Sequence, residues 1–541
     1  MLKKILKYIK FSRYLKEKEK NELINLNNIN NSCLIDKNID INVSNLKDML
    51  GKSSDVVIRE FDFNIEELKI RACICFINGA GNKKMINEYI IKPLMTNSLI
   101  TNNIRNSIKD NTTFYYIKNN ILASVDISEV KTFDESVEAV LSGDAVLFID
   151  GYDRAISVNV KEWNKRSVEQ PETEINIRGS HEGFVELVTI NISLLRRIIK
   201  NRNLIFEAFN IGKQTHTKVY IAYIDGIANP QIIEEVKNRL NHIYIDSILE
   251  SGYIEELIED NPLSPFSTTG NSEKPDKVAA KLLEGRVAIL CDGSPTVLTV
   301  PYLFIEAFQS SEDYYSRAFL SSIMRLLRIL AYLITLLLPA FYIAITTFHQ
   351  EMIPTVLIIT FASSREGVPF PVFIEVMISE IIFMLLRKSG IRMPRAVGSA
   401  VSIVGTLVIG QSAVEAGIIG APMVIVTSLT AIASFIIPSI YDAIIIFRFI
   451  LIFLAGAFGM FGIFVGLLYM TTYMCTLRSF GAPYMSPLAP QNTNGLKDSL
   501  IRVPLWLMNN RPTAITWRDS VRQGQSQMPK KPDMKKGGKS N

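Results

Sequence analysis

Five ionisable side chains stand inside or beside long apolar runs in the second half of the chain, and they are its best candidates for chemistry. They are Glu375, Glu380, Glu415, Asp442 and Arg448. An ionisable group at the centre of a bilayer costs at least about 2.5 kcal/mol, so it calls for a partner or for water. Glu375 and Glu380 lie mid-segment and are the best functional candidates, although an interfacial amphipathic helix would also carry them. The other three are interpreted as interfacial.

A stripe of small and polar residues occurs in the apolar run that begins at Ala396. The residues that recur at steps of three and four, and so share one helix face, are Ser399, Ser402, Thr406 and Gly410, with Gln411 beside them. Such a stripe permits the close approach of a second helix, or it lines an aqueous path. The spacing favours helix packing, and the aqueous path is the alternative interpretation.

One polar segment in the first half of the chain is a candidate contact or ligand loop. Its charged residues are Arg178, Glu182, Arg196 and Arg197, and Gly179 and Gly183 lie among them. Glycines beside charged residues suit a loop that packs against another surface. A contact between subdomains is the first interpretation, and a ligand site is the second.

The sequence contains none of the common signatures of an enzyme or a cofactor site. It has no P-loop, no GxGxxG after a strand and no G-x-S-x-G nucleophile elbow. Its four histidines and five cysteines are scattered, without a CxxC pair or metal-ligand spacing. We therefore expect no catalytic residue, no metal and no cofactor. The net charge of +5 is small for 541 residues and predicts no nucleic-acid partner.

The positions of the charged residues divide the chain into a soluble part, a membrane part and a tail. Residues 1–325 are dense in charge, residues 329–477 are nearly free of it, and the chain is basic again from Arg478. The stretch from Ile329 to Gln350 has no Asp, Glu, Lys or Arg and is long enough to cross the ~30 Å hydrocarbon core as a helix. Further charge-free runs are Ala396–Val414, Ala416–Tyr441 and Phe449–Leu477.

The segment from Ile353 to Leu386 is interrupted by Arg365, Glu366 and two prolines, and predicts a broken membrane helix. Basic residues after it predict that the soluble region lies in the cytoplasm. If each apolar run crosses in turn, the last one leaves the basic C-terminal tail outside the cytoplasm. That contradicts the rule that Lys and Arg are in excess on the cytoplasmic side. Either one segment does not cross fully or the tail is translocated, and the sequence leaves both open.

The soluble part contains an internal duplication. An apolar run that ends in Asn-Gly or Asp-Gly occurs four times, at 72–79, 145–151, 219–226 and 287–293, and each run is typical of a buried strand stopped by a turn. The first and third copies precede a helical pattern, and the second and fourth follow one.

We predict an α/β soluble region of two related subdomains, followed by an α-helical polytopic membrane domain. The expected parts are a basic N-terminal tail (1–52), two subdomains (53–165 and 175–305), the transmembrane domain (320–477) and a basic, partly disordered tail (478–541). Both tails could attract anionic lipid or remain solvated.

From about Asp55 to Arg511 the chain resembles the A subunit of the GerA family of spore germination proteins. The resemblance rests on ordered motifs, which are SPF at 264–266, EKPD at 273–276, LLEGR at 282–286, SEDYY at 311–315, REGVPFP at 365–371, VSIVG at 401–405, GQSAVEAG at 410–417, LRSFG at 477–481 and SPLAP at 486–490. The chain departs from the family pattern at Ser180, His181, Ser267 and Lys274, where the usual motifs are RGPxEGF, SPFP and ERPD.

The resemblance implies the A subunit of a nutrient germinant receptor in the spore inner membrane, with B and C subunits as partners. It implies a homo-oligomer that forms a ligand-gated channel for monovalent cations, while the B subunit, which resembles an amino-acid transporter, binds the nutrient. The pore or gate candidates are then Glu375, Glu380, Ser402, Thr406, Gln411 and Glu415. The alternatives are a secondary transporter with a cytosolic regulatory domain, and a structural scaffold for the B and C subunits.

Overall fold

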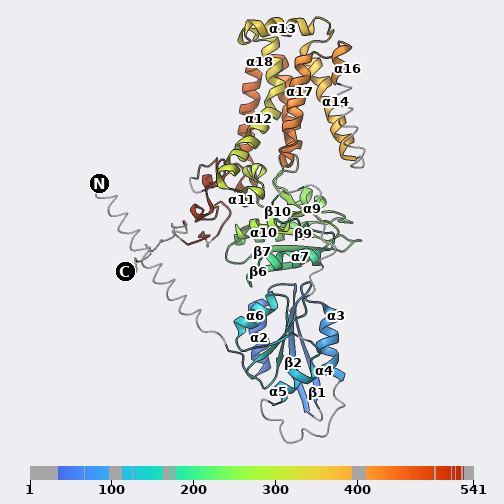
Figure 1. The fold of residues 1–541 in the computed structure, drawn as a ribbon, viewed down its shortest axis with the longest axis vertical. Helices are drawn as coiled ribbons and strands as arrows, with labels where there is room; N and C mark the ends of the chain where they lie inside the picture. Colours follow the sequence, from blue (N-terminus) through green and yellow to red (C-terminus); the bar gives the residue numbers. More distant parts are fainter. Residues whose placement is uncertain are drawn as a thin grey trace, which may run out of the picture.

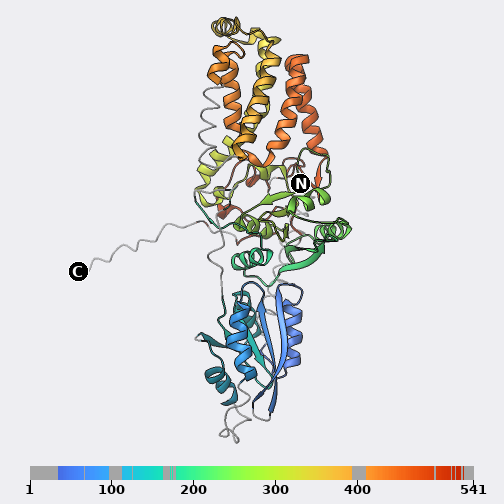
Figure 2. The same ribbon diagram turned by 90° about the vertical axis from the view of Figure 1, so that its right-hand side faces the viewer.

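The computed structural model has three parts stacked along its long axis, an α/β unit at one end, a second α/β unit in the middle and a helical bundle at the other end (Figures 1 and 2). It describes residues 34 to 528 except 66–67, 97–111, 125, 162–170, 172–173, 175–177, 393–409, 493–494, 513, 518–519 and 525–527.

The first unit is a five-stranded antiparallel sheet with helices on both faces. Its strands, in sheet order, are β1 (Val56–Ile65), β2 (Leu68–Ile77), β4 (Ala145–Ile149), β5 (Ala155–Val158) and β3 (Ile127–Val130). One face packs on α2 (Ile39–Leu50) and α6 (Phe133–Leu141). The other face packs on α3 (Lys83–Ile86), α4 (Lys92–Thr96) and α5 (Thr112–Tyr116). The central strands are covered on both sides, and this is why they are continuous apolar runs in the sequence.

The second unit repeats this arrangement. Its strands, in sheet order, are β6 (Leu204–Ile211), β7 (Thr217–Ile224), β9 (Val287–Cys291), β10 (Val297–Val300) and β8 (Gly270–Ser272). One face packs on α7 (Val188–Ile198) and α10 (Pro275–Leu283), and the other on α8 (Pro230–His242) and α9 (Ser251–Ile258). The predicted α/β N-terminal region is confirmed. The four runs that end in Asn-Gly or Asp-Gly are β2, β4, β7 and β9, and the glycines after them have φ values of 98°, 90°, 85° and 89°.

The two units also share hydrogen bonds, and these extend the repeat to α2 and α7. The carboxylate of Asp150 accepts from the backbone N–H of Ile39 at the start of α2, and Asp292 accepts from Val188 at the start of α7, both at 3.1 Å. These aspartates therefore fasten a helix to the sheet. The expected N-terminal tail (1–52) needs correction, because α2 lies within it and buries Leu46 against the first sheet.

The bundle contains α12 (Ala318–Thr347), α13 (Thr355–Arg365), α14 (Val372–Arg392), α16 (Gly410–Glu415), α17 (Ala421–Ser434) and α18 (Tyr441–Thr476). Two stretches of the described chain, residues 318–347 and 438–476, are long and apolar enough to cross a membrane. The segment expected to be broken is divided into α13, which lies across the outer end of the bundle, and α14, which runs back toward the α/β units (Figure 1).

α18 is a helical hairpin. Gly459 has φ 62° and ψ −138°, which is not helical, and it divides α18 into arms at 441–458 and 460–476, each about 26 Å long at about 1.5 Å per residue. The arms lie antiparallel, since the rings of Phe447 and Tyr473 are 6.5 Å apart. A Cβ on Gly462 would lie 2.1 Å from the carbonyl oxygen of Leu454, so the close packing of the arms requires a glycine there. The run Phe449–Leu477 is therefore not one crossing helix, and the chain returns to the side of the α/β units.

The segment after α18 is packed between the bundle and the second α/β unit. The hydroxyl of Ser479 donates to the carbonyl of Thr268 at 2.6 Å and accepts from the N–H of Tyr302 at 2.9 Å. Farther along, the N–H of Trp517 donates to the carbonyl of Ile227 at 3.1 Å. The expectation of a tail from residue 478 onward is therefore corrected for its described part, which connects two regions of the fold.

Candidate functional site in the helical bundle

An ion pair joins two charged side chains inside the bundle. Glu380 of α14 and Arg448 in the first arm of α18 are both fully buried, and a carboxylate oxygen of Glu380 lies 3.1 Å from Nη2 of Arg448. Both residues lie near the middle of their helical segments. The sequence interpretation placed Arg448 at an interface, and the structure instead places it inside the bundle as the partner of Glu380.

Glu375, the second buried carboxylate, lies one turn from the outer end of α14. Its Oε1 accepts from the backbone N–H of Gly420 at 2.5 Å, just before α17, and its Oε2 lies 3.7 Å from Nε of Arg365. Glu375 has no exposed surface. It therefore connects α13, α14 and α17 around the break in the helical segment. The tight contact also leaves little room at Gly420, where a Cβ would lie 3.0 Å from the carboxylate.

The other candidates in the bundle lie elsewhere. Gln411 and Glu415 are exposed in α16 and bond to each other, Nε2 to Oε1, at 3.1 Å. They are separate from the buried carboxylates, at the outer end. Ser402 and Thr406 lie outside the described residues.

The candidate loop of the soluble region contributes one contact between the two α/β units. Arg196 of α7 is 1% exposed and reaches Asp55, which precedes β1, with Nε and Nη2 at 2.8 and 3.0 Å from its carboxylate oxygens. Nη2 of Arg196 also donates to the hydroxyl of Ser53. Arg197 instead pairs with Glu182 within the second unit, and Arg178 is exposed.

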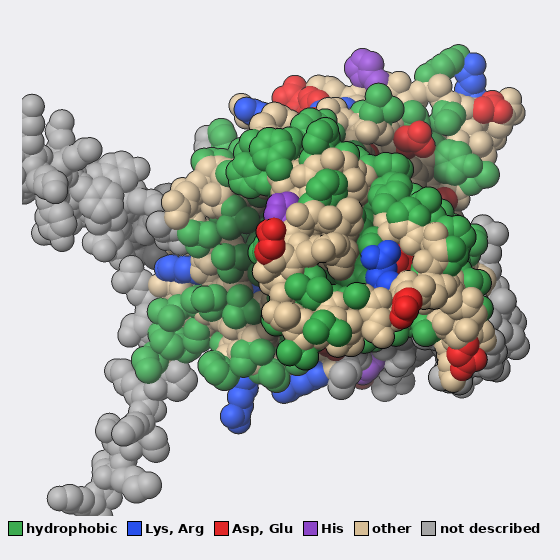
Figure 3. All heavy atoms as spheres, turned by 90° about the horizontal axis from the view of Figure 1, so that it is seen from above, with side chains coloured by type: hydrophobic (Ala, Val, Ile, Leu, Met, Phe, Trp, Pro, Cys, Tyr) green, Lys and Arg blue, Asp and Glu red, His purple; other side chains and the backbone are tan. Residues whose placement is uncertain are grey.

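The outer surface of the bundle is largely apolar. Side chains that are more than half exposed include Val356, Ile359, Leu385, Ile425, Ile432, Phe453, Phe461 and Phe464. Seen from the outer end, hydrophobic side chains cover wide areas between scattered charged groups (Figure 3). A surface of this kind is stable against lipid or another protein and not against water.

Aromatic rings and ion pairs connect the bundle to the second α/β unit, and sequence reasoning did not identify them. Phe266, in the loop before β8, stacks on Phe447 of α18 with ring centroids 5.2 Å apart. Arg325 of α12 has no exposed surface and pairs with Asp313 at 2.9 Å and with Asp498 of the C-terminal segment at 2.8 Å. Among the described residues no group of three or more His, Cys, Asp or Glu could hold a metal ion.

The family model described as Bacillus/Clostridium GerA spore germination protein matches residues 44–514. Spore germination protein KA of Bacillus subtilis is 44% identical over 92% of this chain and 90% of the relative. Uncharacterized membrane protein YfkQ of the same organism is 42% identical over 88% of this chain and 91% of the relative. Spore germination protein GerLA of Bacillus cereus is 37% identical over 88% of this chain and 95% of the relative.

One solved structure is also similar to this chain, the N-terminal domain of the A subunit of the Bacillus megaterium spore germinant receptor GerK3. It is 36% identical, with a TM-score of 0.40, over 50% of this chain and 98% of that structure. The family model and the curated relatives each span most of the sequence, in agreement with the motifs found in it. The chain belongs to the GerA family of spore germination proteins.

Proposed function

We propose that this protein is the A subunit of a nutrient germinant receptor in the spore inner membrane, where it assembles with B and C subunits. In this proposal the bundle is a polytopic membrane domain, and copies of the chain form a ligand-gated channel that releases monovalent cations. The observation that carries the proposal is the presence of Glu375, Glu380 and Arg448 inside an apolar bundle. Charged groups at membrane depth are costly, and they recur where ions or protons pass.

The hairpin at Gly459 supports the proposed orientation. With both arms of α18 crossing, the basic C-terminal segment and the soluble region share one side, as the excess of Lys and Arg in cytoplasmic loops requires. The packing of Ser479 on Thr268 and Tyr302 is in keeping with this arrangement. The N-terminal region then lies in the cytoplasm.

The apolar surface of the bundle supports oligomerisation in lipid. Its exposed side chains include large aromatic residues on α18, such as Phe458, Phe461 and Phe464, at 61%, 69% and 65% exposure. We infer that part of this surface faces lipid and part faces neighbouring copies or the B subunit. The pore is then assembled between chains, with Ser402, Thr406, Gln411 and Glu415 as candidates for its lining. The carboxylates of Glu375 and Glu380, which are buried inside one chain, are candidates for its gate.

Neutralising the buried charges together tests the channel role. The variant Glu375→Gln, Glu380→Gln, Arg448→Gln removes both members of the buried ion pair and the carboxylate of Glu375, so none of these three side chains offers a charge to a cation path. Arg365, the partner of Glu375, keeps its charge, and its side chain is 26% exposed. We expect spores with this variant to release cations at least tenfold more slowly after germinant addition, because a carboxylate at membrane depth lowers the barrier for a cation. Flame photometry of the medium measures the release.

The control for this test is Glu351→Gln with Glu366→Gln, two exposed acids at the outer end of the bundle. Immunoblots of spore membranes measure the protein level of each variant, so that rates of cation release are compared at equal levels. Unchanged release from the triple variant at an equal protein level would remove these residues from the ion path. Substrate uptake by the chain alone, without B and C, would favour the secondary transporter instead.

A further inference from the structure

The chain after α18 includes a segment that is fastened to α12. We call residues 498–517, without 513, the strap. The carboxylate of Asp498 accepts from Nη1 of Arg325 on α12 at 2.8 Å. The backbone N–H of Arg502 donates to the hydroxyl of Ser322, one turn away on the same helix, at 3.2 Å. Because Arg325 has no exposed surface, this end of the strap is held by a buried partner and is fixed to the first turns of α12.

The other end of the strap is fastened to the second α/β unit. Its donors are Nε of Arg511, the hydroxyl of Thr516 and the backbone N–H of Trp517, and the acceptors are the backbone carbonyls of Leu283, Glu284 and Ile227, at 2.8, 3.2 and 3.1 Å. The first two acceptors lie at the end of α10, and the third lies between β7 and α8. The strap therefore joins two loops of the second unit to the first turns of α12.

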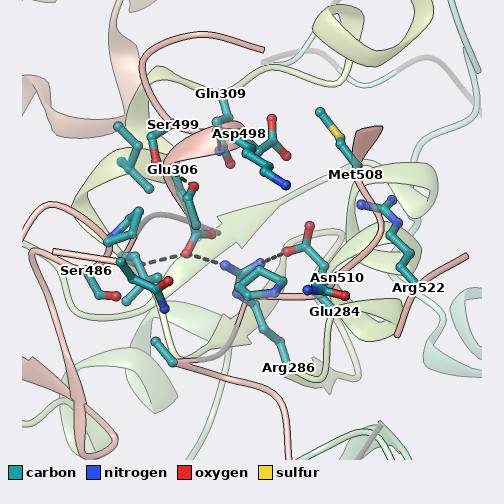
Figure 4. A pocket seen from close by; sticks show the side chains of 18 of the residues that line it. Glu284, Arg286, Glu306, Gln309, Ser486, Asp498, Ser499, Met508, Asn510 and Arg522 are labelled. Carbon is teal, nitrogen blue, oxygen red and sulfur yellow. Dashed lines mark hydrogen bonds and ion pairs between the residues drawn. The ribbon is translucent and has the colours of Figure 1, made fainter. Parts of the chain in front are cut away.

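Between its two ends the strap borders a cavity of about 70 Å³, which the second unit and the connection into α12 also line. The guanidinium of Arg286 lies on one wall between the carboxylates of Glu284 and Glu306, with Asp498 of the strap on the opposite side (Figure 4). A water molecule needs roughly 10–15 Å³ of such space, so the cavity has room for about five waters. Leu505, in the middle of the strap, is 48% exposed. The strap is therefore fastened at its ends and packed less closely between them.

The cavity separates the strap from another connection between the same two parts. The chain itself runs from β10 through residues 301–317 into α12, and Glu306 of this connection lies 2.8 Å from Arg286 of the second unit. Farther along it, Asp313 lies 2.9 Å from Arg325 of α12. Arg325 thus bonds to both connections. A helix joined to a domain at one place can pivot, whereas two attachments on either side of a gap restrain its rotation.

We propose that the strap is a mechanical link, through which a rotation of the second α/β unit against the bundle moves the first turns of α12. Coupling of this kind is carried by hydrogen bonds, ion pairs and rigid elements in contact. The strap supplies such bonds at both of its ends. In the proposed channel, the link carries movement of the soluble region to the bundle. That step rests on the proposed function, whereas the link itself is tested without channel activity.

The test measures whether loosening one end of the strap loosens the other, by hydrogen exchange and mass spectrometry of the full-length protein in detergent. The far-end variant, Arg511→Gln with Thr516→Val, removes two of the three donors to the second unit and leaves Asp498 in place. We expect the amides of residues 321–328 in α12 to exchange at least about fivefold faster, the lower end of typical coupling between sites. Because coupling is reciprocal, the near-end variant Asp498→Ala should in turn speed exchange at residues 514–517.

The control, Arg71→Gln with Thr217→Val, removes the same two kinds of side chain from places away from the strap. Arg71 bonds to Asp40 in the first unit, and Thr217 bonds to the carbonyl of Ile248 at the opposite end of β7 from the strap. This variant should change exchange at either end of the strap less than twofold. All rates are taken relative to the amides of β5 in the same sample, so that a general loss of stability does not count as coupling. If each variant speeds exchange only at its own end, or at neither end, the proposed link is wrong.

Discussion

Replacing Glu380 with leucine is expected to prevent most of the protein from reaching its folded state. The change leaves the guanidinium of Arg448, which has no exposed surface, without its carboxylate partner at 3.1 Å. Removing one member of a buried ion pair costs about 3–5 kcal/mol, because the remaining charge stays desolvated. We expect the folded fraction, measured by size-exclusion chromatography of a fluorescent fusion in detergent, to fall at least tenfold.

A second substitution separates loss of the pair from loss of the side chain. Glu380→Leu combined with Arg448→Met replaces both charges with apolar groups, and this is commonly neutral or stabilising for a buried pair. The double variant should therefore recover most of the folded protein. Glu366→Gln, at an exposed acid, should have no effect. If Glu380→Leu alone gave as much folded protein as the parent chain, the pair would not be a structural element of the bundle.

The second large effect is expected at the contact between the two α/β units. Asp55→Asn removes the charge that Arg196 reaches with two bonds of 2.8 and 3.0 Å, at side chains that are 2% and 1% exposed. We expect a loss of about 3–5 kcal/mol. For a region of this size, about 1 kcal/mol corresponds to about 2–4 °C in melting temperature, so the shift should be about 10 °C. Thermal unfolding of the purified full-length protein, followed by circular dichroism, measures it.

An exposed ion pair in the same unit is the control for this effect. Asp62 pairs with Lys69 across β1 and β2 at 2.7 Å, with side chains that are 43% and 69% exposed. Exposed pairs contribute about 0–1 kcal/mol, so Asp62→Asn should shift the melting temperature by about 3 °C or less. Equal shifts in the two variants would mean that the Asp55 and Arg196 contact contributes no more than a surface pair.

Local sequence patterns predicted the α/β region well, because each pattern has a local cause. The Asn-Gly and Asp-Gly pairs ended β2, β4, β7 and β9 as expected, since glycine adopts positive φ without strain. Their spacing also predicted two related units, and the two sheets have the same strand order. The assignment of residues 39–50 to a tail was wrong because the repeat was read only from the four apolar runs and the helical patterns next to them, and α2 precedes the first of these runs. Asn42 of α2 and Asn191 of α7 bond the backbone six residues earlier in the same way, and this spacing was a usable signal.

The bundle was harder to predict because its decisive contacts join distant parts of the chain. Glu380 and Arg448 are 68 positions apart, and nothing near Arg448 in the sequence indicates that its partner is on another helix. The turn at Gly459 lies in a run of uniform hydropathy, where composition gives no boundary. Its only local signal is the series Gly456, Gly459, Gly462 and Gly466, which sequence reasoning took as packing alone. The C-terminal segment was assigned to a tail because its composition is polar, but its role depends on partners such as Arg325 and Thr268.

Ion conductance of the purified chain across a planar lipid bilayer tests the central proposal most directly. We predict discrete, cation-selective currents from the reconstituted full-length oligomer, and much smaller currents from the Glu375→Gln, Glu380→Gln, Arg448→Gln variant at equal protein incorporation. A correctly folded oligomer that inserts into the bilayer and passes no current, with or without the B and C subunits and germinant, would contradict the channel account.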